Sequence, residues 1–239
     1  MFNIKYPQAC KALLLAAGCL CASVSNAGVV VGGTRVIYDG SKREASLSVS
    51  NADKSPYLIQ AWVDANGTTG DITNAPKPPF VMTPPIFRLD AGNGTDNENM
   101  MRIIRTGGNL PDDRESVFWV NVKAIPASVK DNKNRMQISV KTRIKLFYRP
   151  EGIPSTEENR FKAVSFHRLG NQLQVTNPTP YYMTFYSLKV GSTPIKTTDV
   201  MVPPKGTATY PLTNSGAQVT WQIINDYGGV NNPVTSPVQ

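Results

Sequence analysis

The chain has 239 residues, a formal net charge of +8, three cysteines and a single histidine. No segment approaches the roughly 20 consecutive apolar residues that a membrane-spanning helix requires, so we do not expect the chain to be embedded in a membrane. The few cysteines and the lone histidine argue against thiol- or histidine-based catalysis, which needs a base beside its nucleophile. The excess of basic residues favours acidic partner groups without identifying them.

The first 27 residues have the pattern of an export signal. Lys5 and Lys11 supply positive charge, residues 12–20 form a short apolar run, and residues 25–27 (Ser-Asn-Ala) form a small-x-small cleavage site. Cleavage there would leave a mature chain that begins at residue 28 and contains no cysteine, so its stability must come from packing rather than disulfides. A lipoprotein signal ending at Cys19 is the alternative interpretation.

Alternation of apolar and polar residues dominates the remaining chain and predicts β-strands, with no convincing amphipathic helix. Turn formers such as Asp39-Gly40 and Gly107-Gly108 separate the alternating runs. Short strands separated by turns are typical of antiparallel sandwiches. The predicted strands are 34–38, 45–49, 58–63, 101–105, 116–122, 136–146, 173–175, 183–188 and 219–224.

The run Arg-Pro-Glu-Gly-Ile-Pro at residues 149–154 predicts a domain boundary. Two prolines and a glycine cannot continue a central strand, so the strand before them must leave its sheet. The boundary near residue 150 gives two domains of ordinary sandwich size, 28–149 and 150–239. The predicted fold class is therefore all-β, with two β-sandwich domains.

Six sequence blocks span most of the chain after residue 27. They are GTRVIY at 33–38, PPIFRL at 84–89, DRESVFWVNV at 113–122, AIP at 124–126, IKLFYRP at 144–150 and NDYGG at 225–229. Together and in this order, they resemble the PapD-like periplasmic pilus chaperones of the chaperone-usher pathway. The resemblance implies two immunoglobulin-like β-sandwich domains arranged as an L, with a cleft between them.

The resemblance also implies a function. The chain would bind, fold and cap pilus subunits by donor-strand complementation and deliver them to an outer-membrane usher. A subunit that lacks its last strand exposes an apolar groove and an aggregation-prone edge, which a lent strand covers. Such a protein is periplasmic and needs no catalysis, cofactor, metal, nucleic acid or small-molecule substrate. The alternative function is that of a secreted β-sandwich adhesin or pilus structural subunit.

The resemblance identifies the donor strand with the alternating run that contains Met136, Ile138 and Val140. These side chains would fill the subunit groove, although the alternation alone is also typical of a strand that faces its own core. The preceding loop, residues 127–135, is short and lacks the cysteines that flank a longer loop in the sister subgroup, which indicates the short-loop subgroup.

Two further sets of residues match the family. Arg35 and Lys145 match basic residues that bind the subunit's C-terminal carboxylate in the cleft, and such an anchor fixes the register of the bound strand. Lys145 is odd-numbered, so it falls on the opposite strand face from the donor residues. The second set is a salt bridge between the domains, which we expect to be partly exposed and to affect domain orientation more than folding. Its members are Glu115, Arg149 and Asp226.

An enzyme is the remaining hypothesis. His167 has no cysteine or serine motif around it, and no metal-ligand cluster is visible in the sequence. Asp112-Asp113 and Glu157-Glu158 are paired acids of the kind that glycoside cleavage uses, but adjacent residues of a strand point apart. We expect these acids to lie in solvated turns and expect no catalytic residues.

Overall fold

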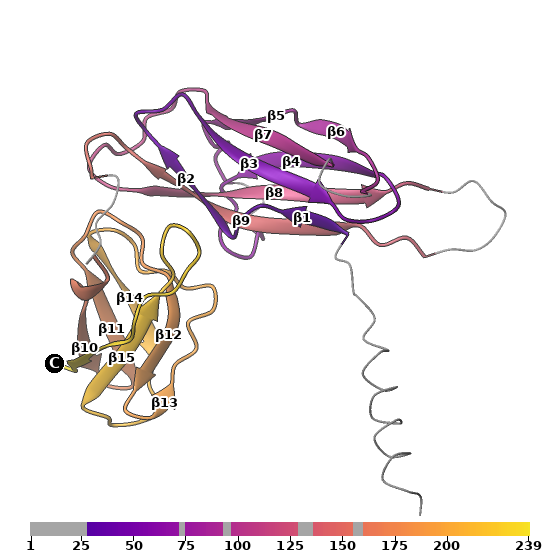
Figure 1. Cartoon of the computed structure of the whole chain (residues 1–239). Coiled ribbons are helices and arrows are strands. Elements are labelled where there is room, and N and C mark those ends of the chain that lie inside the picture. Colours follow the sequence, from indigo (N-terminus) through magenta and orange to yellow (C-terminus); the bar gives the residue numbers. More distant parts are fainter. Residues whose placement is uncertain (1–27, 72–74, 93–96, 129–135, 155–159) are drawn as a thin grey trace, which may run out of the picture.

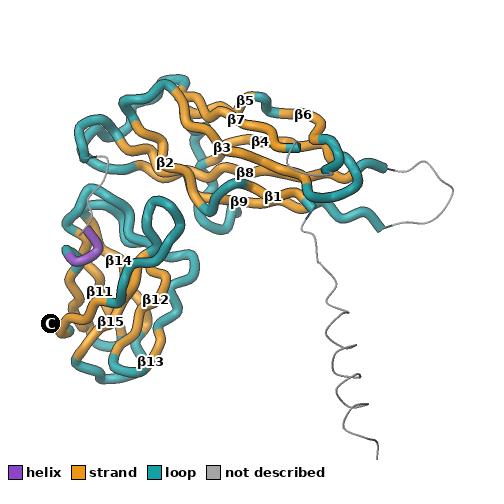
Figure 2. Tube along the Cα trace, viewed as in Figure 1, coloured by secondary structure: helices purple, strands orange, loops and turns teal. Residues whose placement is uncertain are grey.

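The computed structural model describes residues 28–71, 75–92, 97–128, 136–154 and 160–239. The predicted export signal, most of the 127–135 loop and Glu157-Glu158 lie outside the described residues. The described chain forms two β-sandwiches arranged as an L, so the predicted fold class is confirmed (Figure 1). Strands dominate both parts (Figure 2), and the described segments contain no helix long and apolar enough to cross a membrane.

The first sandwich consists of a four-stranded and a five-stranded sheet. The four-stranded sheet has the spatial order β1 (Val29–Val31), β3 (Glu44–Asn51), β7 (Glu98–Arg105) and β5 (Phe80–Thr83). The five-stranded sheet has the order β2 (Arg35–Asp39), β9 (Val140–Arg149), β8 (Ser116–Pro126), β4 (Tyr57–Asp64) and β6 (Ile86–Leu89).

One pairing in this sandwich departs from the antiparallel pattern that the sequence predicted. The chain leaves one sheet after β1 and enters the other as β2, where β2 runs parallel to β9. Gly32 lies at this crossing, where an added Cβ would sit 2.0 Å from the Ser48 hydroxyl oxygen. A residue with a side chain would therefore fit there only if the Ser48 side chain moved.

The core of the first sandwich follows the period of two along each strand. On β9, Ile144, Leu146 and Tyr148 are buried between the sheets, and on β2 the residues Val36 and Tyr38 join them. The residues between them project from the outer face of the five-stranded sheet. This alternation decides which side chains reach the second sandwich.

The second sandwich contains a three-stranded and a four-stranded sheet, preceded by a short 3-10 helix, η1 (Arg160–Lys162). Its core centres on Trp221, whose indole N–H donates to the Phe161 carbonyl at 2.9 Å. The first sheet has the order β10 (Ser165–Leu169), β11 (Gln172–Asn177) and β14 (Gly206–Pro211). The second has the order β13 (Thr193–Pro194), β12 (Phe185–Val190), β15 (Gln218–Ile223) and β16 (Val234–Pro237).

Several predicted strand limits are wrong. The strand predicted for 136–146 enters its ladder only at Val140, and the strand predicted for 183–188 begins at Phe185, with Met183 in an isolated bridge to Val202. Strands β1, β5, β6 and β13 were missed because two to four residues are too few to show a period. Strands β10, β14 and β16 were missed because they contain few apolar residues.

A pair of matched substitutions tests which alternating residues belong to the home core. Ile103 in β7 is fully buried, whereas Ile138 is 69% exposed. We expect Ile103→Ala to lower the free energy of unfolding by about 2–5 kcal/mol through lost burial and a cavity, and Ile138→Ala to change it by less than about 0.5 kcal/mol. Urea unfolding followed by circular dichroism measures both. Equal losses would place Ile138 in the home core.

Candidate functional site

The parallel pairing of β2 with β9 places Arg35 directly opposite Lys145. Their neighbours in each strand enter the core, so both cations project from the outer face toward the second sandwich. They line a cavity of 460 Å³ between the two sandwiches. Its other walls include Trp119, Arg143 and Ile144 from the first sandwich and Tyr186, Asp199, Ile224 and Val230 from the second.

Both cations keep unused hydrogen-bond donors. Arg35 Nη1 donates to the Ile224 carbonyl at 3.2 Å, and its guanidinium lies 5.7 Å from the centre of the Phe147 ring, but its buried Nε has no partner. Lys145 makes no hydrogen bond or ion pair within the described residues. Burial lowers the pKa of Lys145, and the adjacent Arg35 lowers it further. A carboxylate bound here would stabilise the charged forms of Arg35 and Lys145 and would accept hydrogen bonds from both.

Arg143 forms the wall of the cavity beside Lys145. Its Nη1 and Nη2 each donate to a carboxylate oxygen of Asp64 at 2.8 Å, and Nη2 also donates to the Gly67 carbonyl at 2.6 Å. Its guanidinium lies 5.2 Å from the centre of the Trp119 ring. The ion pair neutralises Arg143, so Arg35 and Lys145 carry the net positive charge of this wall.

One edge of β9 has no strand partner over its first half. Strand β8 pairs with β9 from Val140 onward, but on the other side β2 covers only Lys145–Arg149. Within the described residues, no strand therefore pairs with that edge from Val140 to Ile144. An open edge of this kind is a template for pairing with another chain.

Three apolar residues lead into this open edge. Met136, Ile138 and Val140 are 88%, 69% and 60% exposed. Val140 shares the strand face of Ile144 in the core, so the row continues the core-facing side beyond the home core. Ile138 and Val140 border a 280 Å³ cavity whose walls include Val29, Val31, Tyr57, Val122 and Ala124. The predicted opposite placement of Lys145 holds, because the cations lie on the outer face.

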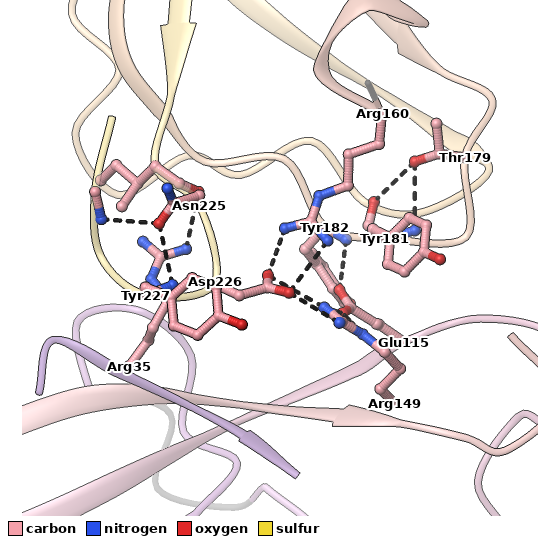
Figure 3. A network of polar contacts seen from close by, with 12 residues as sticks. Arg35, Glu115, Arg149, Arg160, Thr179, Tyr181, Tyr182, Asn225, Asp226 and Tyr227 are labelled. Atoms are coloured by element: carbon pink, nitrogen blue, oxygen red, sulfur yellow. Dashed lines mark hydrogen bonds and ion pairs between the residues drawn. The ribbon is translucent and has the colours of Figure 1, made fainter. Parts of the chain in front are cut away.

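A network of four charged residues joins the two sandwiches (Figure 3). Arg149 donates to Glu115 from Nη2 at 2.7 Å and to Asp226 from Nη1 at 2.9 Å. Arg160 of η1 binds the same Asp226 carboxylate, and both guanidiniums lie over the Tyr181 ring, 5.0 Å and 4.9 Å from its centre. The other Glu115 carboxylate oxygen accepts from the Tyr182 backbone N–H at 2.8 Å. Sequence reasoning brought together three of these residues and missed Arg160.

The expected partial exposure of this network is wrong for its central pair. The side chains of Arg149 and Glu115 are only 4% and 3% exposed. Burial raises the pKa of Glu115, although Arg149 counteracts part of the rise. Burial alone would also raise the pKa of Asp226, but the hydrogen bonds from Arg149 and Arg160 outweigh it and lower that pKa. Buried charges such as these depend on their partners.

The residues considered for catalysis have other contacts. Asp113 accepts from Arg114 at 2.9 Å and from Lys205 of the second sandwich at 2.7 Å, and these hydrogen bonds lower its pKa well below the usual range. His167 lies in β10, opposite Gln174 of β11. The part of the chain that the structure describes contains no cluster of three or more histidine, cysteine or acidic side chains that could hold a metal.

Two sandwiches in an L, with a cation pair in the cleft and an open apolar edge leading to it, define the class of two-domain immunoglobulin-like chaperones. Residues 28–154 match the family described as "Pili and flagellar-assembly chaperone, PapD N-terminal domain". Residues 159–235 match "Pili assembly chaperone PapD, C-terminal domain". The chain therefore belongs to the PapD family of pilus-assembly chaperones.

Known relatives are similar over most of their length. The chain is 44% identical to the "Probable fimbrial chaperone LpfB" of Escherichia coli O157:H7, over 92% of each chain. It is 43% identical to the "Chaperone protein LpfB" of Salmonella typhimurium, over 96% of each. A chain in the solved "Salmonella enterica SafA pilin in complex with the SafB chaperone" is 34% identical, with a TM-score of 0.78, over 90% of this chain and 99% of that one.

Substitution of Arg149 tests the buried network. We expect Arg149→Met to lower the free energy of unfolding by about 3–5 kcal/mol, because Glu115 is left buried without its cation. The double variant Glu115→Gln, Arg149→Met should recover much of this loss, since the unpaired charge is removed. Urea unfolding and the radius of gyration from X-ray scattering measure stability and domain orientation. Wild-type stability and dimensions in the single variant would contradict the expectation.

Proposed function

We propose that this chain captures pilus subunits by lending them the start of β9 and by binding their C-terminal carboxylate at Arg35 and Lys145. Membership of the PapD family supports the general function of a fimbrial chaperone. One structural observation supports the mechanism. The exposed row of Met136, Ile138 and Val140 leads into an open strand edge, and this edge ends at the two cations.

The lent strand serves the subunit in two ways. Its free backbone groups from Val140 to Ile144 can complete a ladder with the subunit, and its exposed apolar side chains can fill the gap in the subunit core. Full burial of one such side chain stabilises by about 1.5–3 kcal/mol, so the row of three supplies a large part of the binding energy. Covering the unfinished edge also protects the subunit from aggregation.

The anchor sets the direction of the bound strand. A subunit strand whose carboxylate lies at Lys145 and whose body lies along residues 136–144 must run in the same direction as β9. This is also the direction of β2, which occupies the same edge from Lys145 onward. The anchor thereby fixes the register, and a slip of one residue would turn the groove-facing side chains to the wrong face.

We further propose that the chain acts in the periplasm and passes its subunits to an outer-membrane usher. The export pattern of residues 1–27 supports this location. The two parts of the family match cover residues 28–154 and 159–235, and this supports a mature chain that begins near residue 28 and has two domains, for which we keep the proposed bounds 28–149 and 150–239. Capture by strand pairing and charge requires no catalytic residue or cofactor.

The anchor is tested by co-purification. The tagged chain, produced in the periplasm of its host during pilus expression, should retain a pilus subunit in stoichiometric amount, identified by mass spectrometry. Arg35→Ala and Lys145→Ala should each weaken retention by about tenfold or more, because each removes charge-assisted hydrogen bonds. Lys141→Ala, on the same face of β9 but exposed, is the matched control. Wild-type retention by both single variants and the double variant would refute the anchor.

The donor row is tested by placing a charge in it. Ile138→Asp should weaken subunit capture by at least about tenfold, because an ionised carboxylate would have to enter an apolar groove. The free chain should unfold at the same urea concentration as the wild type, since Ile138 is exposed. Gln137→Asp adds the same charge one residue earlier and should have little effect. Unchanged capture by Ile138→Asp would exclude this residue from the interface.

A further inference from the structure

Arg160 is a buried cation that was not among the salt-bridge residues predicted from the sequence. It opens η1, and its side chain is 9% exposed. Both of its Nη atoms are directed at the carboxylate of Asp226, whose oxygens also accept from Arg149. Asp226 is therefore held between one arginine from each sandwich (Figure 3).

Asp226 lies on the loop that also contacts the anchor. The Ile224 carbonyl, two residues before Asp226, accepts a hydrogen bond from Arg35. Arg35, Arg149 and Asp226 line a common cavity of 620 Å³. Figure 3 shows the Asp226 carboxylate pointing toward Arg149 and Arg160, with Arg35 on the other side of the loop. Burial lowers the pKa of Arg35, the charge of Asp226 opposes this effect, and the charge of Arg160 adds to it.

The charges of the network balance only when Arg160 is counted. Glu115 and Asp226 are negative, and Arg149 and Arg160 are positive. Without Arg160, the buried Arg149 would be the cation shared by both carboxylates, Glu115 and Asp226. Arg35 lines the same cavity as Asp226, and a buried carboxylate gains from a second cationic partner.

We propose that Arg160 is a positioning residue for subunit binding: by holding Asp226 it keeps the Arg35 guanidinium available for the subunit's C-terminal carboxylate. This inference rests on the proposed function. It assigns the buried Arg160 a role in carboxylate recognition without contact with the subunit, as well as a role in joining the domains.

The test compares two synthetic probes. One is a fluorescein-labelled peptide of alternating valine and threonine, with two N-terminal lysines and a free C-terminal carboxylate, and the other is the same peptide with a C-terminal amide. Fluorescence anisotropy gives the dissociation constant of each. Their ratio measures carboxylate recognition alone, because loss of fold or of the donor edge weakens both probes equally. A wild-type chain that binds both probes equally would refute the proposed anchor itself.

Given a wild-type preference for the carboxylate, Arg160→Met should reduce that preference by about tenfold, the value of one charge-assisted hydrogen bond. Arg160→Lys should restore part of it. Lys162→Met removes the same charge from an exposed position of η1 and should leave the preference unchanged. An unchanged preference in Arg160→Met would overturn the inference.

A double variant separates this role from a structural one. In the double variant Asp226→Asn, Arg160→Met, the Asp226 carboxylate can no longer compete with the probe's carboxylate for Arg35. The preference for the free carboxylate over the amide should therefore return to the wild-type value. If Arg160 acted only by holding the sandwiches together, the double variant would lose more of the contact between them and would show no recovery. That result would also overturn the inference.

Discussion

The parallel pairing of β2 with β9 is the constraint on which the candidate site depends. It sets Arg35 opposite Lys145 and, because it begins there, leaves the earlier edge of β9 open. It also buries Tyr38 and Tyr148 beside each other in the core, with ring centres 5.9 Å apart. A β2 strand that began several residues earlier would cover the edge, and an antiparallel β2 would separate the two cations.

The second sandwich contributes charged and polar groups to the site around Arg35 and Arg149. Buried ionic groups lose hydration and gain only from well-placed partners, so a network of this kind specifies geometry more than it adds stability. Here the partners come from both sandwiches, and the loop that supplies Asp226 also supplies the carbonyl that orients Arg35. The angle between the sandwiches and the position of the anchor are therefore set by the same few contacts.

Sequence reasoning reached the fold class and the main strands because alternation and turn residues report directly on backbone structure. It identified Arg35 and Lys145 only through resemblance, and their role stays a prediction. Alternation says nothing about which strands pair or in which direction, so the parallel pairing was missed. The same pattern continues through Met136 to Ser139, which is why the predicted strand began too early.

Arg160 shows a different limit. Its partner Asp226 is 66 positions away, and a single arginine near a turn-rich segment resembles any solvated cation. Only the folded chain brings the two together. The burial of Arg149 and Glu115 was missed for the same reason, because the depth of a side chain at a junction depends on how two domains pack.

Two ionic links between the described parts of the sandwiches, Lys205–Asp113 and Arg149–Asp226, differ in their exposure to solvent. Lys205 and Asp113 are 40% and 43% exposed, whereas Arg149 is 4% exposed. Dissolved salt screens exposed charges over about 8–10 Å but reaches buried ones far less. Added salt should therefore weaken the exposed Lys205–Asp113 contact while the buried contacts of Arg149 stay formed. Ionic strength would then change how firmly the outer surfaces of the two sandwiches are held together without changing their buried junction.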